Sequence, residues 1–127
     1  MASTVEYGTY IIDLATAMLE NPGGLTEAQG QRIVMIRNQT VNFLTEYMQH
    51  ESSALPNLLA YLAGEADKPL RILIGCCDMI LKGKCGPVQQ DYGDAIVEIR
   101  ECAVAMFEDI EDMHDNLKEL MSNLGMV

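Results

Sequence analysis

The fold is decided by residues 96–124, which read IVEIRECAVAMFEDIEDMHDNLKELMSNL. Apolar side chains recur here at alternating intervals of three and four residues, the spacing of a long helix in a bundle or coiled coil. Gly86-Pro87 predicts the start of this helix and Gly125 its end, because proline suits a first helical turn and glycine commonly follows a last one. The predicted buried stripe consists of Ile96, Ile99, Ala103, Met106, Ile110, Met113, Leu117, Leu120 and Leu124.

The same spacing upstream predicts three further helices. The first, from about residue 4 to 20, is expected to bury Tyr7, Tyr10, Leu14 and Ala17. After the break at residues 21–24, Thr26 can cap a second helix. That helix is expected to bury Ile33, Ile36, Thr40, Phe43 and Tyr47. In the third, Pro69 is expected to bend the helix without ending it, since the stripe continues in phase. This third stripe consists of Leu59, Ala63, Ala66, Leu70, Leu73, Cys77 and Ile80.

A weak internal repeat relates the two halves of the chain. A shift of 63 residues aligns Ile33-Val34 with Ile96-Val97 and Ile36-Arg37 with Ile99-Arg100, by duplication or by generic heptad similarity. The prediction is therefore one all-α domain over residues 1–127, an antiparallel four-helix bundle of two helical hairpins at about 4–50 and 53–125. The hairpins can pair within one chain or between chains.

Composition narrows the classes of partner. The 127 residues carry a formal net charge of -11, with 8 Lys+Arg against 19 Asp+Glu. Sequence-independent nucleic-acid binding needs basic groups, so neither nucleic acid nor an anionic membrane is an expected partner. No apolar run is long enough to span a membrane, and a cytoplasmic protein is expected. The last helix carries acids that form either a solvated outer face or a docking surface for a basic partner: Glu108, Asp109, Glu111, Asp112 and Asp115.

Neither a metal nor a cofactor is expected. The cysteines are Cys76, Cys77, Cys85 and Cys102, without a CxxC pair, which favours reduced thiols that fill the core over a redox switch. Glu111 and His114 form the one Glu-x-x-His pair, whereas a di-iron bundle needs two.

Residues 64–113 carry a resemblance to a known family. Residues 64–75 read GEADKPLRILIG, in which an acid is followed after three residues by Pro-Leu and an apolar helix. Residues 77–86 look like a helix end and turn, and residues 89–113 resemble a second helix. This pattern resembles the dimerisation and histidine-phosphotransfer domain of sensor histidine kinases. The resemblance implies a helical hairpin that forms a bundle and binds the receiver domain of a response regulator.

The chain departs from the family at the phosphoacceptor. Gly64 stands five residues before Pro69, where the family has its histidine, and Glu65 occupies the position of the family's acid. Glycine has no nucleophile, and the sequence has no Gly-rich phosphate loop, so autokinase activity is not expected. His50-Glu51 loosely imitates the missing motif, and His50 is the fallback phosphoacceptor.

The sequence therefore predicts a non-catalytic signalling module that binds a receiver domain or another helical signalling protein. Two alternatives stay open: a phosphorelay phosphotransferase that uses His50, and a purely structural oligomerisation domain. A homodimer is also expected, through an overhang of the last helix that includes Leu117, Leu120, Met121 and Leu124. By position in the family, the partner-binding residues are Leu73, Ile74, Cys77, Asp78, Leu81, Val97 and Arg100.

Overall fold

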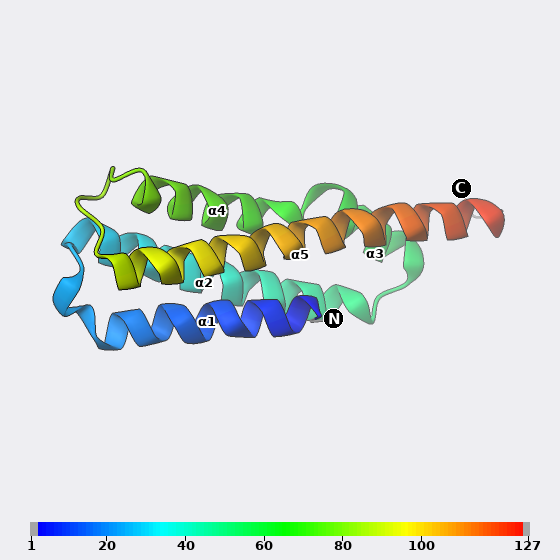
Figure 1. The fold of residues 1–127 in the computed structure, drawn as a ribbon. Helices are drawn as coiled ribbons and strands as arrows, with labels where there is room; N and C mark the ends of the chain where they lie inside the picture. The colour runs from blue at the N-terminus through cyan, green and yellow to red at the C-terminus, as the bar shows by residue number, and fades with distance from the viewer. Residues whose placement is uncertain (1–2, 126–127) are drawn as a thin grey trace.

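The computed structural model describes residues 3–125, which form helices and no strand, and the predicted all-α class is confirmed (Figure 1). Ser3 and Thr26 cap α1 and α2 through their side chains. The elements are α1 (Thr4–Glu20), a short 3-10 turn η1 (Pro22–Gly24), α2 (Glu27–Glu51), α3 (Leu55–Gly64), α4 (Asp67–Leu81) and α5 (Gln90–Asn123).

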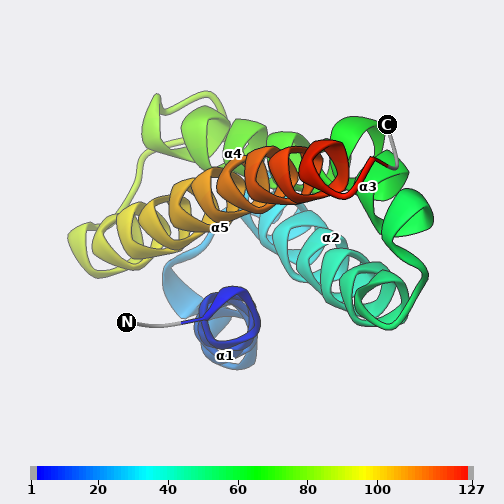
Figure 2. The same ribbon diagram turned by 90° about the vertical axis from the view of Figure 1, so that its right-hand side faces the viewer.

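The helices form an antiparallel bundle in which α3 and α4 follow each other as one interrupted rod. Helix α1 packs against α2, α2 against α4, α4 against α5, and α5 against α1, so the four rods close a ring around the core. Helix α3 packs mainly on α5. Because of this ring order, the α1–α2 face and the α4–α5 face lie on opposite sides of the molecule (Figure 2).

The α1–α2 and α4–α5 connections lie at the same end of the bundle and are joined there by side chains (Figure 1). Thr26 caps α2 as predicted, and it forms a reciprocal capping box with Gln29. The Thr26 hydroxyl also donates to the Cys85 carbonyl at 2.6 Å, and Gln29 Nε2 donates to the Pro87 carbonyl at 2.8 Å. These bonds explain why α5 begins at Gln90 rather than at Pro87: the preceding carbonyls bind α2.

The helix is interrupted just before Pro69, contrary to the prediction that Pro69 would bend the helix without ending it. Helix α3 stops at Gly64, and α4 begins at Asp67. Pro69 has no N–H, and its ring would clash with the carbonyl four residues earlier, that of Glu65, if the helix continued. The break shifts the stripe before it: Leu58, Tyr61 and Leu62 are buried in place of the predicted Leu59 and Ala63.

The prediction for α1 was correct in its bounds and wrong in its buried face. The buried positions are Thr4, Gly8, Ile11, Ala15 and Met18, whereas Tyr10 and Ala17 are exposed and Tyr7 and Leu14 are half-buried. A helix turns by about 100° per residue, so an error of one residue moves the face substantially.

The correct register shows a pseudo-two-fold relation between the halves. A shift of 63 pairs five buried positions of α2 with five of α5, from Ile33 with Ile96 to Tyr47 with Ile110. A shift of 62 pairs the buried face of α1 with that of α4, from Gly8 with Leu70 to Met18 with Ile80. The segment between the last buried residue of the α1 stripe, Met18, and the first of the α2 stripe, Ile33, is therefore one residue shorter than the segment from Ile80 to Ile96 in the second hairpin.

The predicted seam of α5 is buried from Ile96 to Ile110 and opens towards the C-terminal end. Met121 is buried, and Met113 and Leu117 are half-buried. Leu120 and Leu124 remain 44% and 60% exposed. Of the four residues in the predicted overhang, only Leu120 and Leu124 are therefore exposed.

Candidate docking groove between α4 and α5

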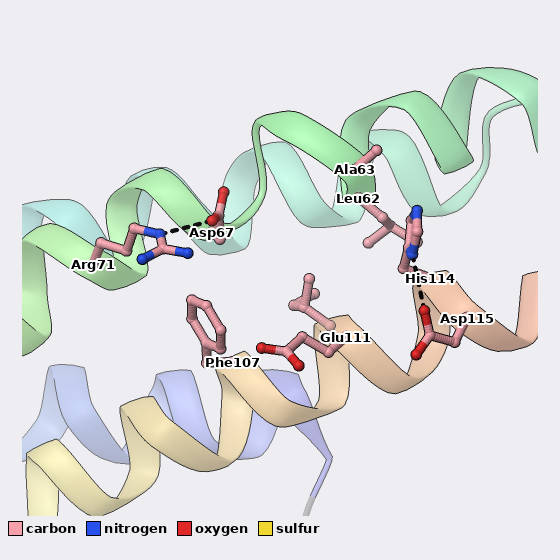
Figure 3. A pocket seen from close by; sticks show the side chains of 9 residues that line it. Leu62, Ala63, Asp67, Arg71, Phe107, Glu111, His114 and Asp115 are labelled. Carbon is pink, nitrogen blue, oxygen red and sulfur yellow. Dashed lines mark hydrogen bonds and ion pairs between the residues drawn. The ribbon is translucent and has the colours of Figure 1, made fainter. Parts of the chain in front are cut away.

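The outer surface between α4 and α5 contains two neighbouring hollows of about 210 and 370 Å³. Arg71 and Phe107 line both, so the two form one groove, hereafter the α4–α5 groove. Figure 3 shows the side chains that line the first hollow. Apolar side chains form its floor, and charged side chains stand along both edges. The lining residues that carry the argument are Asp67, Arg71, Ile74, Asp78, Phe107 and Glu111.

Arg71 is held over the middle of the groove by two contacts. Its Nε donates to Asp67 Oδ2 at 2.8 Å, one helical turn earlier on α4. Its guanidinium carbon lies 5.1 Å from the centre of the Phe107 ring on α5. A cation over an aromatic face is attracted by the ring quadrupole, so Arg71 links the two helices while its polar edge faces solvent (Figure 3).

A second ion pair crosses the groove at its other end. Arg100 Nε on α5 donates to Asp78 Oδ1 on α4 at 2.6 Å. The hydrogen bond to Asp78 and the charge of its carboxylate raise the pKa of the Arg100 guanidinium, which therefore stays cationic. The Asp67–Arg71 pair thus lies over the middle of the α4–α5 groove, and the Asp78–Arg100 pair lies at one of its ends.

The predicted partner-binding residues divide into two groups. Ile74 and Asp78 line the groove, Arg100 borders it, Leu81 is half-buried, and Val97 is 41% exposed. Leu73 and Cys77 are fully buried, so their assignment to a partner contact was wrong: both belong to the core stripe of α4. Burial raises the pKa of the Cys77 thiol to about 12, which keeps it neutral.

Arg71 and Phe107 are groove residues that the sequence prediction missed. Phe107 directly follows the seam residue Met106, which points it to the α4 side of α5. An aromatic residue beside a regular apolar stripe was the available signal. The sequence alone did not indicate that Phe107 would contact Arg71.

The predicted acidic cluster does not face one direction. Glu111 and Asp115 line the α4–α5 groove, together with His114, whose Nδ1 lies 3.2 Å from Asp115 Oδ1. Asp109 instead faces α1 and accepts a hydrogen bond from the Thr4 hydroxyl. The groove therefore has a mainly acidic edge on α5.

His50 lies in a separate hollow of about 430 Å³ at the end of the bundle where α2 meets α3. Its ring stacks on Tyr61, with centroids 4.0 Å apart, and Nδ1 lies 2.8 Å from the Glu46 carbonyl oxygen. A carbonyl only accepts, so this contact selects the neutral tautomer in which Nδ1 carries the proton and Nε2 has the lone pair. Glu65 also lines this hollow, which has no Lys or Arg among its lining residues.

The degenerate phosphoacceptor motif lies at the interruption between α3 and α4. Gly64 is the exposed last residue of α3, Glu65 is exposed, and Pro69 sits in the first turn of α4. The motif therefore lacks both a nucleophile and a continuous helix.

Tyr61 contains a buried hydroxyl without a hydrogen-bond partner among the described residues. An unpaired buried hydroxyl costs stability, so Tyr61→Phe should raise the free energy of unfolding by about 1 kcal/mol. Burial and then Glu46 raise the Tyr61 pKa above 10.0 in the folded state. The unfolded chain loses this proton first, so stability falls as pH rises through about 10, and less steeply in Tyr61→Phe.

Thermal unfolding of both proteins at pH 7 and above pH 10 would measure these effects. Tyr10→Phe is the control, because Tyr10 is 44% exposed and its hydroxyl donates to Glu98. A loss of stability at pH 7 in Tyr61→Phe would contradict the prediction.

Three further observations bear on the chemistry available to the chain. The four cysteines are free thiols, three of them buried and Cys102 half-buried. Among residues 3–125, no group of three or more His, Cys, Asp or Glu side chains is arranged to hold a metal ion. In the same range, every helix is too short or too polar to cross a membrane.

Scans of protein-family models, of curated proteins and of solved structures each gave no match to the chain. The resemblance to a phosphotransfer domain therefore rests on the residues of this chain.

Proposed function

We propose that the chain is a non-catalytic docking module that binds one amphipathic helix of a receiver domain in the α4–α5 groove. The observation that carries this proposal is the groove itself, with its apolar floor, the Asp67–Arg71 ion pair over its middle and the Asp78–Arg100 ion pair at one end. The proposal also draws on the resemblance to the phosphotransfer domain of histidine kinases, in which the receiver inserts a helix between two hairpin helices.

The chemistry of the groove suggests the form of the partner helix. Ile74 and Phe107 offer apolar contact area near the middle, where anchor side chains contribute most of the affinity in helix-in-groove complexes. Glu111 and Asp115 make the α5 edge acidic. A partner helix should therefore carry an apolar stripe with basic residues beside it, and its association should slow as salt increases.

The binding test uses the receiver domains encoded in the genome of the source organism, titrated one by one by calorimetry. At least one should bind, and Ile74→Ala should weaken that complex by about tenfold or more. Ile72→Ala is the matched control, since Ile72 lies on the same helix, 43% exposed, and outside the groove. Its affinity should stay within about twofold of the parent.

Two results would contradict the docking proposal: the absence of binding to every receiver, or equal losses in Ile74→Ala and Ile72→Ala. Circular dichroism of both variants would show that the helices are intact. An acid-labile phosphoryl group that appears on His50 with an aspartyl-phosphate receiver would favour the phosphotransferase instead. The unprotonated Nε2 of His50 favours that alternative, because it could act as the nucleophile. The residues lining the hollow include no Lys or Arg that would bind a phosphoryl group, which argues against it.

A further inference from the structure

The hollow of about 430 Å³ where α2 meets α3, hereafter the His50 hollow, contains polar groups that the docking proposal does not use. His50 comes from the last turn of α2, Tyr61 comes from α3, and Glu65 directly follows the end of α3. The hollow shares no lining residue with the α4–α5 groove, so a site here does not depend on the docking proposal. Its lining residues are His50, Ser53, Asn57, Ala60, Tyr61 and Glu65.

Tyr61 contributes a hydroxyl that the chain itself does not satisfy. The residue is 3% exposed, and its hydroxyl has no hydrogen-bond partner among the described residues. Buried polar groups in folded proteins are almost always paired. A phenylalanine would fill the same space without an unpaired hydroxyl. The hydroxyl is therefore best explained by a group that binds it from outside the chain.

The rings of His50 and Tyr61 hold each other in place within the hollow. They stack with centroids 4.0 Å apart and an angle of 3° between their planes. The contact of His50 Nδ1 with the Glu46 carbonyl oxygen, at 2.8 Å, selects the tautomer in which Nε2 is unprotonated. His50 therefore offers a hydrogen-bond acceptor on a ring that is already fixed.

The charge of the hollow determines the charge of its ligand. Glu65 is the charged lining residue, and no Lys or Arg accompanies it. An anion would be repelled by Glu65 and by the net charge of -11, whereas a cation is attracted by both. In residues 3–125, no three His, Cys, Asp or Glu side chains are arranged to hold a metal ion. The donor set therefore fits an organic cation better than a metal ion.

We propose that the His50 hollow binds a primary ammonium group, either of a free alkylamine or of a lysine side chain. An ammonium group has three N–H donors and no acceptor. The hollow offers three acceptors: the Glu65 carboxylate, His50 Nε2 and the Tyr61 hydroxyl oxygen. The bound ammonium gives the Tyr61 hydroxyl the partner that it lacks, and Ala60 gives the alkyl chain an apolar contact.

The test is an NMR titration of the full chain with n-butylammonium at about pH 8, where histidine is ordinarily neutral. The amide signals of Asn57 and Glu65 should shift saturably, with a Kd of about 1–10 mM. The isosteric but uncharged n-butanol should not shift them.

Three variants test the named acceptors and the effect of overall charge. Glu65→Gln should weaken the binding of n-butylammonium by about tenfold or more, and Tyr61→Phe by about threefold or more. Glu108→Gln is the matched control, because it removes the same charge from an exposed position on α5 outside the hollow. Its affinity should stay within about twofold of the parent.

A blocked peptide, acetyl-Gly-Lys-Gly amide, distinguishes the two sources of the ammonium group. An affinity equal to that of n-butylammonium identifies the lysine side chain of a partner protein as a ligand. Binding of n-butylammonium alone identifies a free amine.

Three results would each overturn the proposal. The first is equal shifts with n-butanol and n-butylammonium. The second is an equal loss in Glu65→Gln and Glu108→Gln, which would mean that the shifts report only the charge of the whole chain. The third is an unchanged affinity in Tyr61→Phe, which would mean that water satisfies the hydroxyl. Because Tyr61→Phe should be more stable than the parent at pH 7, unfolding cannot explain a lost affinity in that variant.

Discussion

Ile36→Ala and Ile99→Ala should each lower the free energy of unfolding by about 3–4 kcal/mol, through the lost apolar transfer and the cavity left behind. Both isoleucines are fully buried, and the shift of 63 residues makes them pseudo-symmetric equivalents on α2 and α5. If the two halves pack alike around the core, the two losses should agree within about 1 kcal/mol. Each should lower the Tm by about 10–15 °C.

Denaturant unfolding at one fixed protein concentration is the suitable measurement, because any self-association makes the Tm depend on concentration. Ile72→Ala is again the control and should change stability by less than about 0.5 kcal/mol, since that side chain is 43% exposed. A loss in one half more than about 2 kcal/mol greater than in the other would contradict equivalent packing.

Gln29→Ala should be the most destabilising change of a polar side chain, at about 3 kcal/mol. Gln29 is 1% exposed and makes bonds that no other residue can replace. Its Oε1 accepts from the Thr26 N–H, and its Nε2 donates to the carbonyls of Gly86 and Pro87. Alanine leaves these groups unpaired between α2 and the start of α5.

The control for Gln29→Ala is Gln31→Ala, the same substitution two residues further along α2, at an exposed position. It should leave the free energy of unfolding within about 0.5 kcal/mol of the parent. Equal effects in the two variants would mean that the joined turns contribute nothing beyond helix propensity.

Most of the fold could be predicted because heptad spacing is a strong signal over long helices. All five residues predicted to be buried on α2 are buried, and the α5 seam was correct through Ile110. The α1 face was wrong because the segment from the α1 stripe to the α2 stripe is one residue shorter than the segment from the α4 stripe to the α5 stripe. A constant shift of 63 aligns α1 with α4 at Tyr7, Tyr10, Leu14 and Ala17, which is the face predicted in error.

The candidate site was less predictable than the fold. Position along α4 suggested Ile74 and Asp78, which line the groove, but a resemblance in sequence does not give the rotation of a helix, so it could not exclude the buried Leu73 and Cys77. The ion pair of Asp78 with Arg100 joins residues 22 apart in the chain, and it requires the relative height of two helices. The relative height of α4 and α5 depends on the turn between them. In that turn Gly86 adopts a φ of 107°, and α5 does not begin until Gln90.

The placement of the α1–α2 face and the α4–α5 face on opposite sides of the ring has a consequence for competition between binding partners. A helix bound in the α4–α5 groove would leave the α1–α2 face uncovered. A second molecule could therefore contact that face without displacing the first.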